Sequence, residues 1–221
     1  MSNTFIISSL DPATPRYHRD VTAEAPIRAP GKGERTRARV LAIAVERFAA
    51  GGFRHTSVAD IARAADLTPA AVYAYFDGKD ALFKAAVDAD ASALIDRSRR
   101  AATAPSLRER LGLFVANLFA ALDDHPLARR VLSGLEPEVV GRLLDLPSLK
   151  ALVAELTEDI TDGQADGEIR ADVDPAAIAL GLEAIVLALL MAQLQTGVGP
   201  ASERSLRAFE VLDAALRPPK A

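Results

Sequence analysis

The sequence predicts an all-α protein with a small three-helix N-terminal domain joined to a larger helical domain. Apolar residues recur at helical spacing through most of the chain, and no stretch of the second half shows the apolar–polar alternation of a strand. Only 5% of the residues are aromatic while Ala and Leu are abundant, a composition that favours helix. Gly- and Pro-containing breaks separate the helical segments, and a hydrophobic content of 50% is ample for a core.

Charge and cysteine content narrow the classes of function. The 221 residues carry a net charge of −4, which argues against a protein that binds nucleic acid along its whole surface. Any contact with DNA must therefore be a local basic patch. The absence of Cys excludes a disulfide framework and a thiolate zinc site, and it fits the reducing cytoplasm. We expect a cytoplasmic protein without a cofactor.

The N-terminal segment, residues 1–34, is predicted to be a flexible arm. It contains four prolines, ends in Gly31-Lys32-Gly33 and shows no helical period. Its only apolar run, Phe5-Ile6-Ile7, is too short for a secretory signal and lacks a basic flank. Basic residues gather where the arm ends: Lys32, Arg35, Arg37 and Arg39. They fit either a solvated face or contacts to phosphate or the minor groove, and both readings stay open.

A first helix is predicted from about Glu34 to Ala50. Its apolar stripe consists of Val40, Leu41, Ala44, Val45 and Phe48. We expect Gly51-Gly52 to end it, because glycine adopts the left-handed C-cap conformation at little cost.

Two short helices joined by a tight turn follow. Thr56 or Ser57 is placed to cap the first of them, and Asp60 completes a capping box. Asp66 then interrupts the helical period, in a turn position where Asp tolerates a positive φ better than most residues.

The second short helix begins directly after this turn. Thr68 is its N-cap and Pro69 occupies the first helical position, where the missing N–H has no cost. Val72 and Phe76 are four residues apart and point inward. The outward face therefore carries small residues and one phenol: Pro69, Ala70, Tyr73 and Ala74. A helix of this shape can enter the major groove of DNA.

This segment resembles the DNA-binding domain of the TetR family of bacterial regulators, whose pattern is Thr-x-x-x-x-Ile-Ala-x-x-Ala-Gly-Val-Ser-x-Gly-x-x-Tyr-x-Tyr-Phe-x-x-Lys-x-x-Leu. The matching residues are Thr56, Ile61, Ala62, Ala65, Tyr73, Tyr75, Phe76, Lys79 and Leu82. Asp66, Thr68 and Ala70 depart from the pattern by sterically mild changes, which bear on the operator sequence more than on the fold. A packed helical hairpin without a DNA role explains the apolar matches equally well, but not two tyrosines and a lysine at these offsets.

The resemblance implies a helix-turn-helix DNA-binding domain over residues 35–82 and a helical effector-binding and dimerisation domain over 83–217. It implies a transcriptional regulator, a repressor, that binds a palindromic operator in double-stranded DNA as a homodimer and is released by a small molecule. The DNA-binding residues we expect are Arg37, Thr56, Ser57, Thr68, Pro69, Ala70, Ala71, Tyr73, Tyr75 and Lys79. The alternative is a helical ligand-binding or protein-interaction module without operator binding.

The second domain is predicted as a helical bundle. After a turn at Asp77-Gly78, a long helix opens at Lys79 and links the two domains. The next helices are expected from Ser106 to Asp123-Asp124, from Pro126 to Leu132, and from about Pro137 to Asp162 with a break at Pro147-Ser148. Residues 163–173 are predicted to be a polar loop.

A ligand cavity is expected between the inner faces of these helices. Its predicted lining is Phe114, Asn117, Leu118, Glu183, Leu187 and Met191, with Asn117 and Glu183 as polar anchors. A filled core fits these residues equally well. If the cavity exists, its effector is a mainly hydrophobic small molecule.

The helix predicted over residues 174–195 is the most apolar of the chain. Small residues form a flat stripe along one face: Ala177, Gly181, Ala184, Ala188 and Ala192. Glu183 in the middle and the lack of basic and aromatic anchors argue against a membrane span. A helix that is apolar all round must be buried on both sides. We therefore expect a homodimer through this helix and the last one, 202–216, as the resemblance also implies.

Catalysis is not predicted. The three histidines, His18, His55 and His125, fall in different segments, and none has a metal-ligand spacing or a nucleophile nearby. We expect neither a catalytic nor a metal site, and no enzyme activity.

Overall fold

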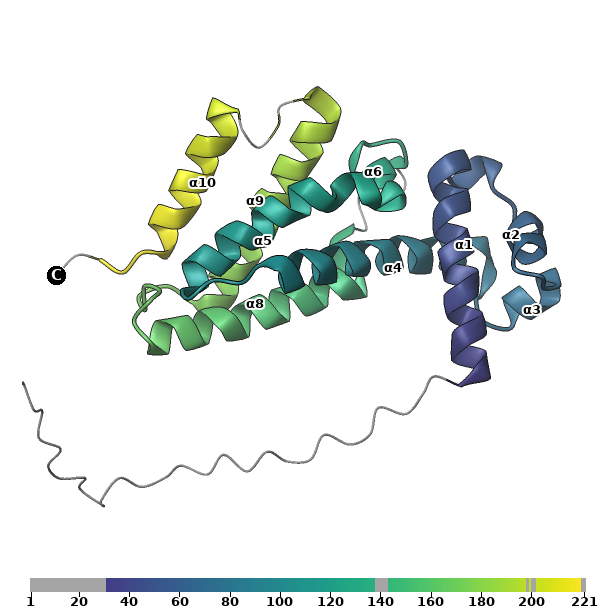
Figure 1. The fold of residues 1–221 in the computed structure, drawn as a ribbon, viewed down its shortest axis with the longest axis horizontal. Coiled ribbons are helices and arrows are strands. Elements are labelled where there is room, and N and C mark those ends of the chain that lie inside the picture. The colour runs from purple at the N-terminus through teal and green to yellow at the C-terminus, as the bar shows by residue number, and fades with distance from the viewer. Residues whose placement is uncertain (1–30, 138–142, 198, 200–201, 220–221) are drawn as a thin grey trace, which may run out of the picture.

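The computed structural model describes residues 31–137, 143–197, 199 and 202–219, and these residues form helices without strands (Figure 1). The α-helices are α1 (Lys32–His55), α2 (Val58–Ala64), α3 (Pro69–Tyr73), α4 (Gly78–Ala101), α5 (Leu107–Ala121), α6 (Pro126–Leu132), α8 (Pro147–Ala165), α9 (Pro175–Thr196) and α10 (Glu203–Leu216). Two 3₁₀ turns are η1 (Leu122–Asp124) and η2 (Leu143–Asp145). The predicted all-α class is confirmed.

The small domain consists of α1, α2, α3 and the first turns of α4. Its core contains Val40, Ala44, Phe48, Ile61, Val72, Phe76, Leu82 and Phe83, all of them buried. Three rings pack where α1 meets α4, with the centroid of Phe83 4.8 Å from that of Phe48 and 5.1 Å from that of Phe53. Such aromatic pairs stabilise a core beyond the area that they bury.

Helix α1 is longer at both ends than the sequence predicts. Gly31 is its N-cap, and the Gly31 amide donates a hydrogen bond to the Glu34 carboxylate at 2.6 Å. Residues 32–34 therefore belong to the helix rather than to the predicted arm, whose residues 1–30 lie outside the described part of the chain. Near its end α1 kinks at Gly52, with φ of 73°, so the helical backbone is interrupted there and resumes through His55.

Helix α4 belongs to both domains (Figure 1). Leu82 and Phe83 are buried in the small core, while Leu94 and Ile95, about three turns later, are buried among the helices of the second domain. The domain boundary predicted at residue 82 falls inside this continuous helix, and the exact bounds of the two domains stay a prediction.

The region around α8 differs from the prediction. The predicted helix beginning at Pro137 falls largely on residues 138–142, outside the described residues, and residues 143–145 form η2. Helix α8 starts at Pro147 and runs to Ala165, so the predicted loop at 163–173 is wrong at its start. Gly163 is buried, and a Cβ there would lie 2.7 Å from the Leu107 side chain. The close approach of α5 explains a glycine inside a helix.

The carboxylate of Asp90 joins α4 to α6. It accepts hydrogen bonds from the backbone amides of Leu127 and Ala128, each at 2.9 Å, and one of its oxygens lies 2.9 Å from Nδ1 of His125. Asp90 and His125 are both buried, each with 7% of its surface exposed. An anionic cap on free amides at a helix N-terminus is favourable, and hydrogen bonds to a charged acceptor are stronger than neutral ones. Asp90 therefore fixes the start of α6 on α4.

We expect Asp90→Ala to lower the free energy of unfolding by about 3–5 kcal/mol, because two buried amides and His125 lose their partner at once. Urea denaturation at one protein concentration measures the difference. The matched control is Asp96→Ala on the exposed side of the same helix, expected to change stability by about 0.5 kcal/mol or less. Equal stability of the two variants would contradict the role assigned to Asp90.

Candidate DNA interface and ligand cavity

Helix α2 is capped by Ser57. The Ser57 hydroxyl accepts from the Asp60 amide at 3.0 Å and donates to the Asp60 carboxylate at 2.6 Å, and Arg63 binds the same carboxylate at 3.0 Å. The hydrogen bond from Ser57, helped by Arg63, lowers the pKa of Asp60. This carboxylate therefore stays ionised near the start of α2, where it complements the helix dipole.

Thr56 does not lie where the sequence places it. Only 7% of its surface is exposed, and its hydroxyl donates to the Arg47 carbonyl at 3.0 Å. Its expected DNA contact is thus wrong as a side-chain contact, since the hydroxyl is used inside the protein to join the end of α1 to α2. The sequence allows either Thr56 or Ser57 as cap, and the tertiary contact with Arg47 decides between them.

The turn between α2 and α3 follows the prediction. Asp66 has φ of 53°, the only positive φ among the described residues other than glycine. The Leu67 amide then donates to the Ala62 carbonyl at 2.9 Å, and the Thr68 hydroxyl accepts from the Ala71 amide at 3.2 Å. Pro69 occupies the first turn of α3, as expected.

Helix α3 exposes the predicted face. Val72 is fully buried and Phe76 is 5% exposed, so this short helix is held by its inner side. The residues left outside are Thr68, Pro69, Ala70, Ala74, Tyr73 at 51% exposure and Tyr75 at 38%. Ala71 is half-buried. The exposed face thus offers methyl and methylene groups with two phenols, suited to thymine methyls and to phosphate oxygens.

The basic start of α1 lies beside this face. The Arg37 guanidinium stands 5.1 Å from the ring centroid of Phe76, and the Tyr75 hydroxyl would lie 3.9 Å from a Cβ on Gly33. Lys32, Arg35, Arg37 and Arg39 are all exposed. Residues 31–80 hold eight Lys and Arg against six Asp and Glu, a net charge of +2 in a chain of −4. The local basic patch that the sequence requires therefore adjoins α3.

Lys79 has a role in the structure that the sequence did not reveal. Its ammonium lies 4.5 Å from the centroid of the Phe53 ring and 3.5 Å from the Arg54 carbonyl near the end of α1. A cation over an aromatic face and near a helix C-terminus is stabilised by both. Lys79 is half-buried, and its contact with phosphate stays a prediction.

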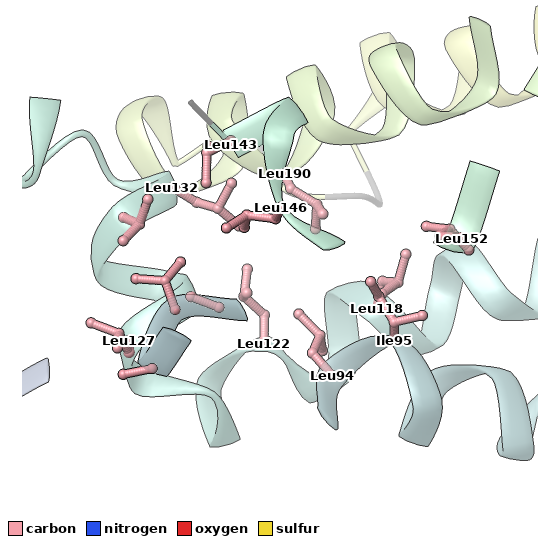
Figure 2. Packing of buried hydrophobic residues seen from close by; sticks show 14 of the residues in the cluster. Leu94, Ile95, Leu118, Leu122, Leu127, Leu132, Leu143, Leu146, Leu152 and Leu190 are labelled. Carbon is pink, nitrogen blue, oxygen red and sulfur yellow. The ribbon is translucent and has the colours of Figure 1, made fainter. Parts of the chain in front are cut away.

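A cavity of about 110 Å³ lies inside the second domain. Side chains from α4, α5, α6, η2, α8 and α9 line it, and Leu94 of α4 and Leu190 of α9 face each other across it in Figure 2. Of the predicted lining, Phe114, Leu118, Glu183 and Leu187 are present.

Asn117 and Met191 do not line the cavity. The Asn117 amide donates to the Ser98 carbonyl at 3.2 Å, which uses this side chain to join α5 to α4. Met191 packs half-buried against the core. Conversely, α4 and α6 contribute lining residues that the sequence did not predict: Val87, Ala91, Leu94, Ile95, Ala128, Val131 and Leu132. No sequence signal separates these from other buried apolar residues.

Glu183 is the one polar residue among the described residues that line this cavity. Its carboxyl is half-buried, and that burial raises its pKa. The basic residues of the neighbouring helices α6 and α8 bind other carboxylates: Arg129 binds Asp123, Arg130 binds Glu136 and Lys150 binds Asp145.

Helix α6 lies between this cavity and the small domain. Ala128, Val131 and Leu132 face the cavity. On its other side the Arg130 guanidinium binds the Glu136 carboxylate at 2.7 Å and approaches the Ala49 carbonyl at 3.4 Å. The same carboxylate oxygen accepts from the Phe53 amide at 3.2 Å.

Gly52 lets α1 approach this pair. A Cβ there would collide with the Arg130 guanidinium and the Glu136 carboxylate, and the positive φ also favours glycine. The two sides of α6 thus contact the cavity and the end of α1.

The described residues include two of the three histidines of the chain. No cluster of three or more His, Asp or Glu there could hold a metal ion. His55 is exposed and His125 is bound to Asp90, while His18 lies outside the described part.

Comparison with known proteins places the N-terminal domain in a family. Residues 40–86 match the family model of bacterial regulatory proteins of the tetR family. No curated protein matches the chain by sequence. The fold is similar to a TetR-family transcriptional regulator from Cytophaga hutchinsonii, at 23% identity and a TM-score of 0.65 over 87% of this chain and 100% of that one.

Two further solved structures share the fold. A Rhodococcus sp. protein assigned to the TetR family is 22% identical, with a TM-score of 0.67 over 82% of this chain and 98% of that one. FadR of Bacillus subtilis, solved with stearoyl-CoA, is 20% identical, with a TM-score of 0.61 over 81% of this chain and 99% of that one. The helix-turn-helix domain of this chain thus matches the tetR family of bacterial regulatory proteins, and the chain as a whole shares the all-α fold of solved TetR-family regulators.

Proposed function

We propose that this protein is a cytoplasmic, ligand-responsive repressor that binds a palindromic operator as a homodimer. The observation that carries the proposal is the exposed face of α3 beside the basic start of α1, with Phe76 packed under Arg37. One α3 helix offers few contacts for a specific site, so two copies related by a dimer axis supply the missing affinity and set the spacing of the half-sites.

The cavity supports release of the operator by a small molecule. A ligand there touches α6 through Ala128, Val131 and Leu132, and α6 holds the end of α1 through Arg130 and Glu136. A ligand that binds more tightly to one of two positions of α6 therefore favours that position and, through α1, the orientation of the small domain that goes with it. The ratio of its affinities for the two positions sets the size of this shift in population. The stearoyl-CoA complex of the Bacillus subtilis relative is consistent with an apolar effector in this fold.

The surface of α9 supports the homodimer. Ala177, Gly181, Ala184 and Ala188 are exposed, and so are the larger Leu180 and Ile185, at 54% and 39%. Helix α10 packs on α5 through an Arg108–Asp213 ion pair and the Phe119–Phe209 rings, leaving Leu206 and Val211 exposed at 51% and 66%. Soluble monomers rarely leave apolar patches of this kind in water. A second copy would cover them.

Helix α9 also has the length and composition of a membrane span, with a mean hydropathy of 2.2 and 17% of its most apolar window buried. Its flat stripe of small residues favours a protein partner, because small side chains let two helix backbones approach closely. Glu183, in the middle of the helix and among the residues that line the cavity, is costly in a bilayer.

We expect the wild-type protein to shift double-stranded DNA flanking its own coding region in an electrophoretic mobility assay. Ala70→Glu should weaken this binding at least about tenfold, since the new carboxylate on exposed α3 repels phosphate. Ala93→Glu, exposed on α4 in the second domain, is the matched control and should bind as wild type. A native, dimeric wild type that ignores specific DNA would instead support a ligand-binding module without operator binding.

A second prediction concerns Lys79, which we propose contacts a phosphate while it lies over Phe53. Lys79→Gln should weaken binding to all DNA sequences alike and reduce the slope of log K against log salt by about 0.9. Circular dichroism of the variant controls for folding, because the cation–π contact is lost as well. A folded variant with an unchanged slope would assign Lys79 to the α1–α4 junction alone.

The dimer predicts that Ala188→Arg raises the dissociation constant of the homodimer at least about 100-fold, because a two-fold interface receives two unpaired charges from one substitution. Sedimentation equilibrium measures this dissociation constant, and Ala154→Arg, at an exposed position of α8, is the matched control. Operator binding should fall in parallel. A monomeric wild type, or an Ala188→Arg protein that stays a dimer, would contradict this interface, and partition of a monomer into vesicles would assign the face to a membrane.

A further inference from the structure

The chemistry of the cavity restricts the class of ligand beyond its hydrophobicity. Among the described residues that line it, all are aliphatic or aromatic except Glu183, which comes from the middle of α9. Apolar walls favour any hydrophobic ligand by area, whereas polar groups in a pocket decide which ligand is accepted. Selectivity in this cavity therefore depends on what Glu183 accepts.

Glu183 has no hydrogen-bond donor or cation of its own among the described residues. The Lys and Arg side chains of α6 and α8, the helices that pack against α9, each bind a different carboxylate: Asp123, Glu136 or Asp145. Helix α9 itself contains neither Lys nor Arg. Burial alone raises the pKa of the Glu183 carboxyl, without an opposing cation. A ligand that fills the cavity removes more water from this group and increases the cost of its charge.

We infer that the cavity selects a hydrophobic amine, whose protonated nitrogen binds the Glu183 carboxylate while its apolar body fills the space between Leu94 and Leu190. This inference rests on the proposed function, because it names the ligand class of the same cavity. A ligand cation supplies the partner that the protein does not, and a charge-assisted hydrogen bond in a partly dry site is stronger than a neutral one. A carboxylic acid of the same shape brings a second negative charge against Glu183 and is disfavoured.

The basic residues nearest to the cavity, between α5 and α8, do not reverse this selectivity. Arg99 and Arg110 lie there, in a neighbouring depression that shares Leu111, Phe114, Leu152 and Leu156 with the cavity. Arg99 is bound by Glu155 and Asp159, and Arg110 donates to the carbonyls of Ala104 and Pro105. These cations are thus neutralised or engaged, whereas Glu183 is not.

Three probes of one chain length test the inference: octylamine, 1-octanol and octanoate. Isothermal titration calorimetry of the full-length wild type at pH 7 should give octylamine the lowest dissociation constant, at least about tenfold below that of octanol, with octanoate the weakest. Glu183→Gln should remove most of the advantage of the amine over the alcohol and leave octanol binding within about threefold. The matched control Glu158→Gln, exposed on α8, should preserve the wild-type order.

Several outcomes overturn the inference. Octanol or octanoate binding as tightly as octylamine, or an amine preference that survives Glu183→Gln, shows that Glu183 does not select the ligand. Binding of none of the three probes also overturns it. The mobility shift of the same wild-type preparation measures operator binding separately. If the protein binds DNA but shows no preference for the amine, the proposed function holds and only the ligand class is wrong. If the amine preference is found but no DNA is bound, only the proposed repressor function is wrong.

Discussion

The buried carboxylate of Asp90 is the contact on which the arrangement of the two domains depends. It closes the free amides at the start of α6 and binds His125, so α6 is fixed to the middle of α4. Helix α4 in turn runs from the core of the small domain into the second one (Figure 1). An uncompensated carboxylate at this depth would be costly, but with its three partners it holds two helices in one register.

Once α6 is fixed in this way, its two sides serve different contacts. The side with Ala128, Val131 and Leu132 closes the ligand cavity, and the side with Arg130 reaches Glu136 and the end of α1. Glycine suits position 52, because a larger residue would displace the Arg130–Glu136 pair and would be strained at a φ of 73°. A short helix thus lies between a cavity and the domain that carries α3. This continuous set of contacts is the physical basis of the coupling we propose between ligand and DNA.

Helix α9 lines the cavity with one side and carries the proposed dimer surface on the other. Its inner side carries Leu182, Glu183, Val186 and Leu190 to the cavity, and its outer side carries the small residues proposed for the dimer. A ligand in the cavity would therefore be separated from the proposed partner subunit by the thickness of one helix. Packed interfaces respond to such contacts by discrete shifts rather than by gradual deformation.

The sequence by itself determined the local features. The all-α class, the cap at Thr68, the positive φ of Asp66, the buried side of α3 and, to within one residue, the bounds of α9 and α10 all follow from short-range patterns. Such features depend on hydrogen bonds and side-chain spacing within a few residues. The resemblance to the family pattern identified α2 and α3 as a helix-turn-helix.

Only the tertiary structure decided which residues meet across the chain. Thr56 is buried by its bond to Arg47, Lys79 lies over Phe53, and Asn117 is held by Ser98 rather than facing a ligand. Helical periodicity identifies a buried face but not whether its neighbours leave a cavity or fill it, because that depends on the fit of side chains from helices distant in sequence. For the same reason Glu183 was visible in the sequence as a charge in an apolar helix, while its lack of a partner among the described residues became visible only when α6, α8 and α9 were packed together.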